Sequence, residues 1–322
     1  MLFPISISDG THAYVPAVME HIELAGIHSG DSACILPSKH IPEDALETIK
    51  DYTRKIAEEM HVVGLMNMQY AIENDVVYVL EANPRATRTV PLVSKVCGIS
   101  MVPIATDIIT SELTGRESPV AKLGERDIPY YGVKEAVFPF KMFQEVDPVL
   151  GPEMRSTGEV LGISRTPGGA FFKAEEGASA TLPTEGTVLF SISDKDKPEL
   201  VEVAQIFTDD GFKILATGRT CDMLNEAGIP AKKVNKLYQG RPNILDLITN
   251  GQIQLIVNSP SGKDSAHDDS YLRKNAIKAR IPYITTMAAA RSAAEGITHV
   301  KEHGSKYVHS LQEWHSMIGT QE

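Results

Sequence analysis

The spacing of apolar residues predicts a helix and a β-hairpin in the first part of the chain. Between positions 42 and 60 the apolar residues recur every three or four positions: Ala45, Ile49, Tyr52, Ile56 and Met60. This period places them on one face of a helix. Two strand-like runs, 63–72 and 76–81, then flank the turn-forming triplet 73–75, which indicates a hairpin. Residues 91–113 look helical in pieces.

The pattern changes after residues 117–186, which are rich in Gly and Pro and contain short β-like runs such as Tyr131–Phe138. Beyond them, helical segments separate five short apolar runs: Val188–Ile192, Lys213–Ala216, Lys232–Val234, Leu255–Val257 and Tyr283–Ile284. Such alternation is typical of a parallel sheet wrapped by helices. We therefore predict an α/β protein with a boundary near Thr184, an α+β domain at 1–184 and a doubly wound parallel-sheet domain at 185–322.

Composition narrows the range of partners and compartments. The 322 residues suffice for two domains, and 31 basic against 42 acidic residues give a net charge of −11. No run of Lys and Arg exceeds two, so neither nucleic acid nor an anionic membrane is an expected partner. Three cysteines without C-x-x-C spacing favour a cytoplasmic protein over a disulfide or zinc scaffold. The longest uncharged apolar stretch, 96–106, is too short to span a bilayer.

The register of the hairpin decides whether its polar residues can form a site. A three-residue turn at 73–75 pairs Gln69 with Val79 and Asn67 with Glu81, so Gln69 and Glu81 share a face. A two-residue turn would move Glu81 to the opposite face, because side chains alternate along a strand. We expect the three-residue turn.

On a shared face, these side chains offer a candidate metal and phosphate site. Gln69, Glu81 and Asn83 supply the amide and carboxylate oxygens that Mg²⁺ prefers. Arg85 and Arg88 follow directly and supply fixed positive charge for phosphoryl oxygens. An exposed hairpin with solvated polar residues is the alternative, and spacing alone leaves both open.

Three longer strings give a specific resemblance. They are Glu81-Ala82-Asn83-Pro84-Arg85, the segment from Met19 to Ser32, and the segment from Gly151 to Val160. From about Ser6 to about Met317, the chain resembles the large subunit of carbamoyl phosphate synthetase, in the part that contains the second ATP-grasp half. In that family this half phosphorylates carbamate with ATP to give carbamoyl phosphate, in pyrimidine and arginine biosynthesis.

The resemblance implies roles for individual residues. It makes Gln69, Glu81 and Asn83 ligands of Mg²⁺, with Mn²⁺ as the alternative ion, and makes Arg85 and Arg88 the phosphate contacts. It places Ile27, His28 and Ser29 in the ATP pocket, although His28 by itself is better interpreted as a structural loop residue.

The same resemblance implies missing parts. The family's nucleotide-clamping subdomain and its first synthetase half precede the point where this chain starts, so we expect an inactive fragment of an ATP-dependent ligase. Its expected partners are the missing N-terminal part of the large subunit and the glutaminase small subunit that supplies ammonia. We also expect residues 2–7 to form an exposed apolar sheet edge that the missing part would cover.

The second domain resembles the methylglyoxal-synthase-like regulatory module of that family. Its physical signal is Ala216-Thr217-Gly218-Arg219-Thr220, which follows a strand and opens a helix, where backbone N–H groups and hydroxyls can hold a phosphate. An ordinary βα turn is the alternative. With the resemblance, the expected phosphate contacts of an effector are Lys197, Thr217, Thr220, Lys236 and Asn258.

The resemblance also implies ligands for this module. The family's effectors are UMP or IMP, and many members bind ornithine, for which the matching residues are Glu23, Asp31, Glu135, Tyr283 and Thr285. Methylglyoxal synthase catalysis is not expected, because Gly240-Arg241-Pro242-Asn243 replaces the catalytic Gly-Gly-Asp turn. Pro260 stands where a hydroxyl residue is common. A catalytically inactive protein that senses UMP-like or IMP-like ligands is the alternative function.

Overall fold

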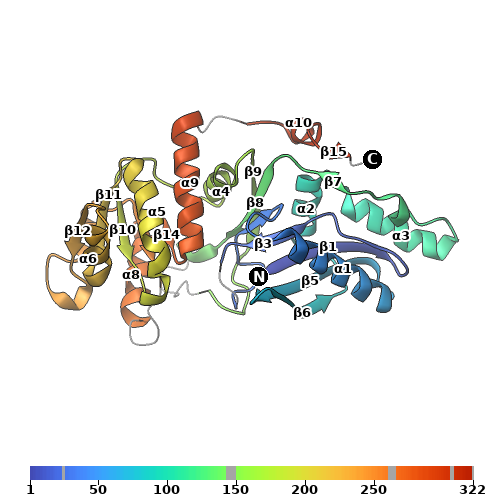
Figure 1. Ribbon diagram of the computed structural model, residues 1–322, viewed down its shortest axis with the longest axis horizontal. Coiled ribbons are helices and arrows are strands. Elements are labelled where there is room, and N and C mark those ends of the chain that lie inside the picture. The colour runs from blue at the N-terminus through green and yellow to red at the C-terminus, as the bar shows by residue number, and fades with distance from the viewer. Residues whose placement is uncertain (24–25, 143–149, 260–265, 305–307, 321–322) are drawn as a thin grey trace. The chain divides into compact units, whose positions relative to one another are not determined.

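The computed structural model describes residues 1–23, 26–142, 150–259, 266–304 and 308–320. The chain divides into two compact units (Figure 1). The first unit comprises Met1–Lys134, Ile163–Pro167 and Val308–Glu322, and the second comprises Glu135–Gly162 and Gly168–Tyr307. Helices and strands are both abundant, as expected for an α/β chain.

The first sheet has the strand order β6-β5-β1-β3-β4-β8-β9, with β2 added beside β1. Its strands are β1 (Leu2–Asp9), β2 (Ala13–Tyr14), β3 (Val18–His21), β4 (Cys34–Leu36), β5 (Val63–Glu73), β6 (Val76–Asn83), β8 (Tyr131–Val137) and β9 (Gly158–Ser164). The accompanying helices are α1 (Glu43–Glu59), α2 (Val90–Cys97), α3 (Met101–Thr114) and the 3-10 turn η1 (Val120–Lys122). Strands β8 and β9 contribute residues to both units.

Strand β1 is not an exposed edge, so the expectation for residues 2–7 is wrong. It pairs with β3 on one side and β5 on the other, and its residues from Leu2 to Ser8 are buried. The strand contains two serines, Ser6 and Ser8. They are nevertheless fully buried, and the Ser6 hydroxyl donates to the Met66 carbonyl at 3.4 Å. The strands at the ends of the sheet are β6 and β9.

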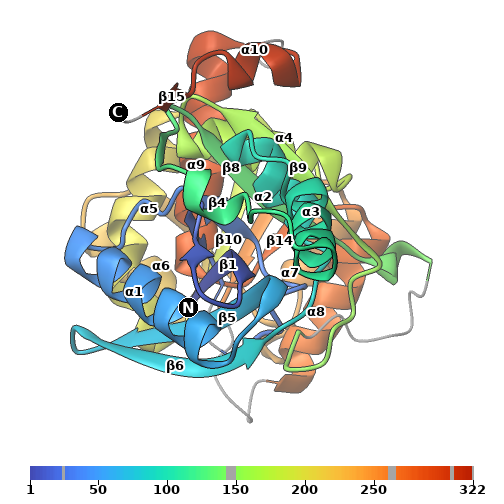
Figure 2. The same cartoon turned by 90° about the vertical axis from the view of Figure 1, so that its right-hand side faces the viewer.

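Helix α1 confirms the predicted helix, although its buried stripe is narrower than expected. It packs beside β1 and β5 (Figure 2). Ile49, Thr53 and Ala57 are buried, whereas Tyr52 and Met60 of the predicted stripe are exposed. The hydroxyls of Thr53 and Tyr70 lie 2.8 Å apart in this core.

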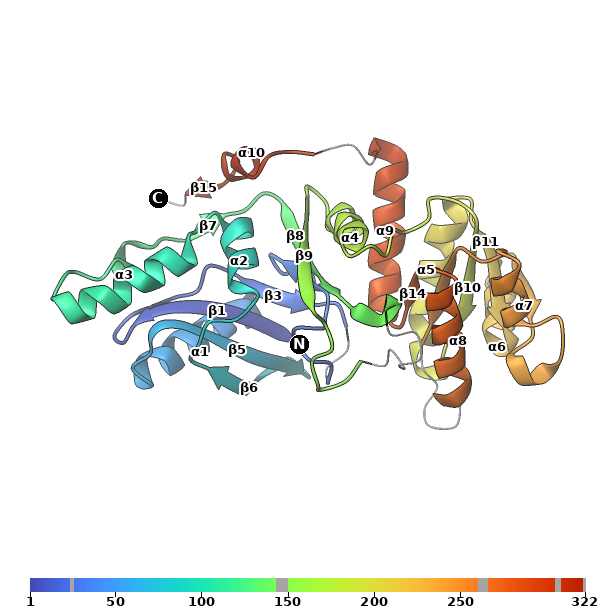
Figure 3. The ribbon, with the colours of Figure 1, turned by 180° about the vertical axis from the view of Figure 1, so that it is seen from behind.

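The C-terminal segment belongs to the first unit (Figure 3). Strand β15 (Gly319–Thr320) pairs with β7 (Arg126–Asp127), and helix α10 (Leu311–His315) packs against α2. Trp314 is buried there, with its ring 5.0 Å from the ring of Tyr130. None of the described helices alone is long and apolar enough to cross a membrane. Helices α2 and α3 meet that test only as a pair bent by 108°.

The second unit contains the predicted parallel sheet, with the strand order β12-β11-β10-β13-β14. These strands are β10 (Thr187–Ser191), β11 (Lys213–Thr217), β12 (Ala231–Val234), β13 (Leu255–Asn258) and β14 (Tyr283–Ile284). The helices are α4 (Pro167–Gly177), α5 (Lys197–Asp209), α6 (Gly218–Glu226), α7 (Ile244–Thr249), α8 (Ala266–Lys278) and α9 (Met287–His303). Three 3-10 turns accompany them: η2 (Pro139–Lys141), η3 (Asp194–Asp196) and η4 (Leu237–Gln239). All strand pairs in this sheet are parallel, which confirms the prediction.

Both faces of this sheet are covered. One core cluster joins Leu189 and Ile256 to residues of α7 and α8, whereas Phe190, which points to the other face, contacts Phe207 of α5. Helices α4 and α9 approach closely through glycine, because a Cβ on Gly296 would lie 2.6 Å from the Gly168 carbonyl oxygen.

Candidate functional site

The hairpin of β5 and β6 turns at two residues, so the predicted three-residue turn is wrong. Glu73 pairs with Val76, which leaves Asn74 and Asp75 as the loop. Their φ angles are +50° and +62°. Positive φ at both central residues is the conformation of a type I′ turn, and Asn and Asp tolerate it better than most residues.

A β-bulge in β6 nevertheless restores the predicted face. The register set by the turn continues as far as Val79, but Gln69 then pairs with Glu81, so Leu80 is an extra residue. The extra residue returns Glu81 to the face of Gln69. The prediction that these two side chains share a face is therefore confirmed, and they lie directly opposite rather than diagonally.

Three polar side chains converge on this face. Gln69 Nε2 donates to Glu81 Oε1 at 2.6 Å, and Asn83 Nδ2 donates to the same oxygen at 2.8 Å. The second oxygen, Glu81 Oε2, makes no hydrogen bond to the part of the chain that the structure describes. We call Gln69, Glu81 and Asn83 the hairpin site. It lies on the face opposite Met68 and Tyr70, which pack in the cluster that contains residues of α1.

Asn67 shares the face but supports the backbone. It pairs with Asn83 in the ladder and is only 2% exposed. Its Nδ2 donates to the carbonyl oxygens of Asn83 and Arg85, at 3.4 and 3.5 Å. The amide therefore ties the end of β6 to the segment that carries the arginines.

Of the two arginines, Arg88 contacts the loop predicted to bind nucleotide. Arg88 Nη2 donates to the Gly30 carbonyl at 3.0 Å, and the Gly30 N–H donates to His28 Nδ1, also at 3.0 Å. Ile27, His28 and Ser29 are half-buried in this loop between β3 and β4. Arg85 is exposed, and its Nη1 lies 3.4 Å from the Ala86 carbonyl oxygen.

Lys134 is a residue of this region that sequence reasoning missed. It is fully buried on β8, and its ammonium donates to the Ser29 carbonyl at 2.8 Å. The available signal was a charged residue in the middle of an apolar strand-like run. On strand β3, which β4 separates from β8, burial, reinforced by the charge of Lys134, lowers the pKa of His21 to about 3.

The second candidate site lies at the carboxyl ends of the parallel strands. Ser191 ends β10, Thr217 ends β11 and Asn258 ends β13, while Lys236 follows β12, so all four lie at the same edge. The strand order reverses between β10 and β13, which is where open α/β sheets bind ligands. The topology thus brings three of the expected phosphate contacts, Thr217, Lys236 and Asn258, to one edge of the sheet, and their role in binding phosphate stays a prediction.

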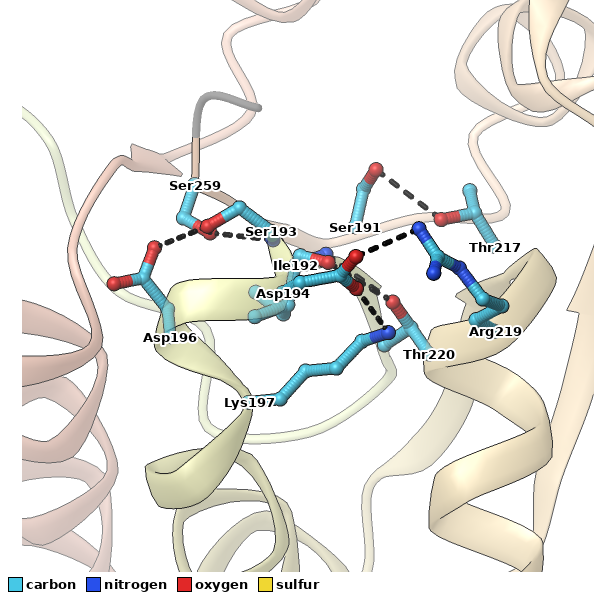
Figure 4. Close-up of polar contacts among 10 residues, drawn as sticks. All are labelled: Ser191, Ile192, Ser193, Asp194, Asp196, Lys197, Thr217, Arg219, Thr220 and Ser259. Atoms are coloured by element: carbon cyan, nitrogen blue, oxygen red, sulfur yellow. Dashed lines mark hydrogen bonds and ion pairs between the residues drawn. The ribbon is translucent and has the colours of Figure 1, made fainter. Parts of the chain in front are cut away.

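Several hydroxyl groups lie together at this edge and are hydrogen-bonded (Figure 4). The Thr217 hydroxyl donates to that of Ser191 at 3.2 Å, and the Ser193 N–H donates to the Ser259 hydroxyl at 2.9 Å. Thr220, in the first turn of α6, accepts from the Ile192 N–H at 3.3 Å. We call the region between Ser191, Ser259 and the first turn of α6 the crevice.

Asn258 and Lys236, two of the residues predicted to contact phosphate, have different surroundings. Asn258 Nδ2 donates to the Tyr283 hydroxyl at 2.6 Å. A residue of the predicted phosphate site is therefore hydrogen-bonded to a residue of the predicted ornithine site. Lys236 is half-buried past the end of β12.

The ornithine residues lie in both units, and their joint site stays a prediction. Glu23 and Asp31 belong to the first unit, and Glu135, Tyr283 and Thr285 belong to the second. Asp31 and Glu135 are buried, at 1% and 8% exposure. Pro260 lies outside the described residues.

The chain thus combines a hairpin that carries a carboxylate and two amides in one unit with a doubly wound parallel sheet in the other. Residues 8–113 match the family model "Carbamoyl-phosphate synthase L chain, ATP binding domain", and residues 199–285 match the model "MGS-like domain". The chain belongs to the carbamoyl phosphate synthase large-chain family and corresponds to its C-terminal section.

Curated relatives are similar over most of this chain. A carbamoyl phosphate synthase large chain from Gemmatimonas aurantiaca is 49% identical over 97% of this chain and 28% of its own length. The proteins named "Carbamoyl phosphate synthase large chain, C-terminal section" from Methanopyrus kandleri and Aquifex aeolicus are 49% and 45% identical. They are matched over 90% and 96% of this chain, which spans 54% and 60% of their lengths.

Proposed function

We propose that this chain contributes to the Mg²⁺- and ATP-dependent phosphorylation of carbamate to carbamoyl phosphate, in the cytoplasm, for pyrimidine and arginine biosynthesis. The observation that carries the proposal is the hairpin site, where one carboxylate and two amides converge and which two arginines follow in the sequence. The rest of the large subunit would complete the site, and the glutaminase small subunit would supply ammonia.

The donor set of the hairpin site fits Mg²⁺. Glu81 is exposed, and its Oε2 makes no hydrogen bond to the described residues. The amide nitrogens of Gln69 and Asn83 face Glu81 Oε1, and the same two amides carry the oxygens that would complete the donor set. Across the described ranges, no group of three His, Cys, Asp or Glu residues could hold a metal. A site with a single carboxylate suits Mg²⁺, because this ion keeps several waters and takes further ligands from substrate phosphates. Bound there, Mg²⁺ would neutralise negative charge on the transferred phosphoryl group.

The neighbouring residues would position the nucleotide. Arg85 and Arg88 would contact phosphoryl oxygens, because guanidinium groups match them in geometry and charge. Arg88 also holds the loop of Ile27, His28 and Ser29, since it bonds to the next carbonyl in that loop. This hydrogen bond supports a nucleotide pocket in which the loop is held at a fixed position relative to Arg88.

The crevice would bind the phosphate of a regulatory nucleotide. Lys197, Thr217, Thr220, Lys236 and Asn258 are the proposed contacts of UMP or IMP. The supporting observations are the common strand edge and the hydrogen-bonded hydroxyl groups. Ornithine would bind through Glu23, Asp31, Glu135, Tyr283 and Thr285.

The experiment follows Mn²⁺ as a spectroscopic substitute for Mg²⁺ in the full chain with ADP. We expect Glu81→Gln to weaken nucleotide-dependent Mn²⁺ binding by about tenfold or more, because the only carboxylate of the site is lost. Glu73→Gln is the matched control, since it removes a carboxylate from the turn end of the same strand pair. Equal Mn²⁺ binding by both variants would contradict the proposed site. ATP formation from carbamoyl phosphate and ADP, with and without the preceding polypeptide, tests the reaction.

A further inference from the structure

At the mouth of the crevice, one carboxylate holds two cations. Asp194 Oδ1 accepts a hydrogen bond from Lys197 Nζ at 2.6 Å, and Asp194 Oδ2 lies 2.8 Å from Arg219 Nη2 (Figure 4). Lys197 begins α5 and Arg219 lies in the first turn of α6. The carboxylate therefore bridges the beginnings of two helices that follow neighbouring strands.

The three side chains differ in their exposure to solvent. The side chain of Lys197 is 16% exposed, whereas those of Asp194 and Arg219 are 59% and 79% exposed. Lys197 is thus part of the wall, and the other two extend toward solvent. Exposed ion pairs contribute little to stability, so breaking the pair of Arg219 and Asp194 costs little free energy.

The contacts of Asp194 are those that a phosphate would make. Two oxygens on one centre accept from a lysine and an arginine beside a helix N-terminus, where negative charge is stabilised. The hydrogen bond from Lys197, and then the charge of Arg219, lower the pKa of Asp194, so it is ionised at neutral pH.

We propose that Asp194 is a built-in competitor of the ligand in the crevice, and that a phosphomonoester binds by displacing it. This inference rests on the proposed function of the crevice as a phosphate site. Lys197 and Arg219 then transfer their contacts from the carboxylate to the phosphate. With Asp194 displaced, the two cations face the ligand with two positive charges, which matches a phosphomonoester carrying nearly two negative charges at pH 7. A singly charged phosphodiester gains less, so the arrangement selects terminal phosphates.

The test measures UMP and IMP binding to the full chain by calorimetry, with Asp194→Asn as the main variant. We expect Asp194→Asn to tighten binding by roughly fivefold or more, because it keeps the size of the side chain but removes the competing charge. Asp222→Asn is the matched control. It removes a carboxylate from α6 that pairs with Lys233 at 3.4 Å, so it reports the effect of net charge alone, and we expect a change below about twofold.

Two further variants separate the possible results. Arg219→Gln should weaken binding of UMP more than binding of a uridine phosphodiester. Lys236→Ala tests the phosphate site itself, independently of Asp194. If the wild-type chain binds UMP or IMP and Lys236→Ala weakens that binding, the phosphate site stands. Unchanged or weaker binding by Asp194→Asn would then overturn the proposal that Asp194 competes with the ligand. If neither the wild-type chain nor Asp194→Asn binds UMP, IMP or inorganic phosphate, both proposals fail.

Discussion

His21 makes the stability of the first unit depend on pH in a direction that the structure fixes. Its side chain is buried, and neither ring nitrogen has a hydrogen-bond partner in the described residues. Burial, followed by the charge of Lys134, lowers its pKa from 6.5 to about 3. Between these two values the unfolded chain binds a proton that the folded chain does not bind. The free energy of unfolding therefore falls as the pH falls through this window.

The magnitude follows from the two pKa values. Between pH 7 and pH 5 the unfolded histidine becomes almost fully protonated while the folded one stays neutral, so this residue removes about 2 kcal/mol from the stability. In His21→Leu this contribution disappears, and the loss between pH 7 and pH 5 should be smaller by that amount. His12→Gln is the control, because His12 is 68% exposed.

Urea unfolding followed by tryptophan fluorescence provides the assay. Trp314 is the only tryptophan, and it lies buried in the first unit with His21. We plot against pH the difference in unfolding free energy between each variant and the wild-type chain. For His21→Leu this difference should change between pH 7 and pH 5, and for His12→Gln it should stay constant. Parallel curves for the wild-type chain and His21→Leu would refute the neutral buried histidine.

Three further predictions concern packing and backbone conformation, and urea unfolding measures each. Thr53→Val should cost about 1–3 kcal/mol, because it leaves the buried Tyr70 hydroxyl without its partner, and Tyr70→Phe in the same chain should recover part of this loss. Gly296→Ala should destabilise the second unit by about 3 kcal/mol, since the new Cβ would lie 2.6 Å from a carbonyl oxygen of α4, whereas Gly124→Ala meets no atom within 4 Å and should be silent. Asp75→Gly should stabilise the hairpin by up to about 1 kcal/mol, because glycine accepts the positive φ of +62° without strain.

Elements with a strong local pattern were predicted correctly. The apolar runs at 188–192, 213–216 and 255–257 correspond to β10, β11 and β13, and the helical spacing at 42–60 corresponds to α1. In these elements, the residues that specify the structure lie close to each other in the sequence. Parallel pairing then follows from the alternation of strands and helices.

The hairpin shows where local reasoning stops. The sequence-based turn was one residue too long, and the bulge at Leu80 was not foreseen, yet Gln69 and Glu81 still face each other. The shorter turn and the bulge cancel each other, because each shifts the strand register by one residue. Nothing in the composition of β6 distinguishes a regular strand from one with an extra residue, since the bulge depends on how that strand pairs along its whole length.

The loop that contains His28 shows the same limit at longer range. Ser29 and Gly30 present adjacent carbonyl oxygens, which accept from Lys134 and Arg88 respectively. These cations lie 105 and 58 positions away in the sequence. Burying the ammonium of Lys134 without a partner would cost free energy, so its bond to Ser29 fixes the loop and the lysine together. The local string predicts only a loop, whereas its contacts with Lys134 and Arg88 depend on the fold, which brings these two charged residues to it.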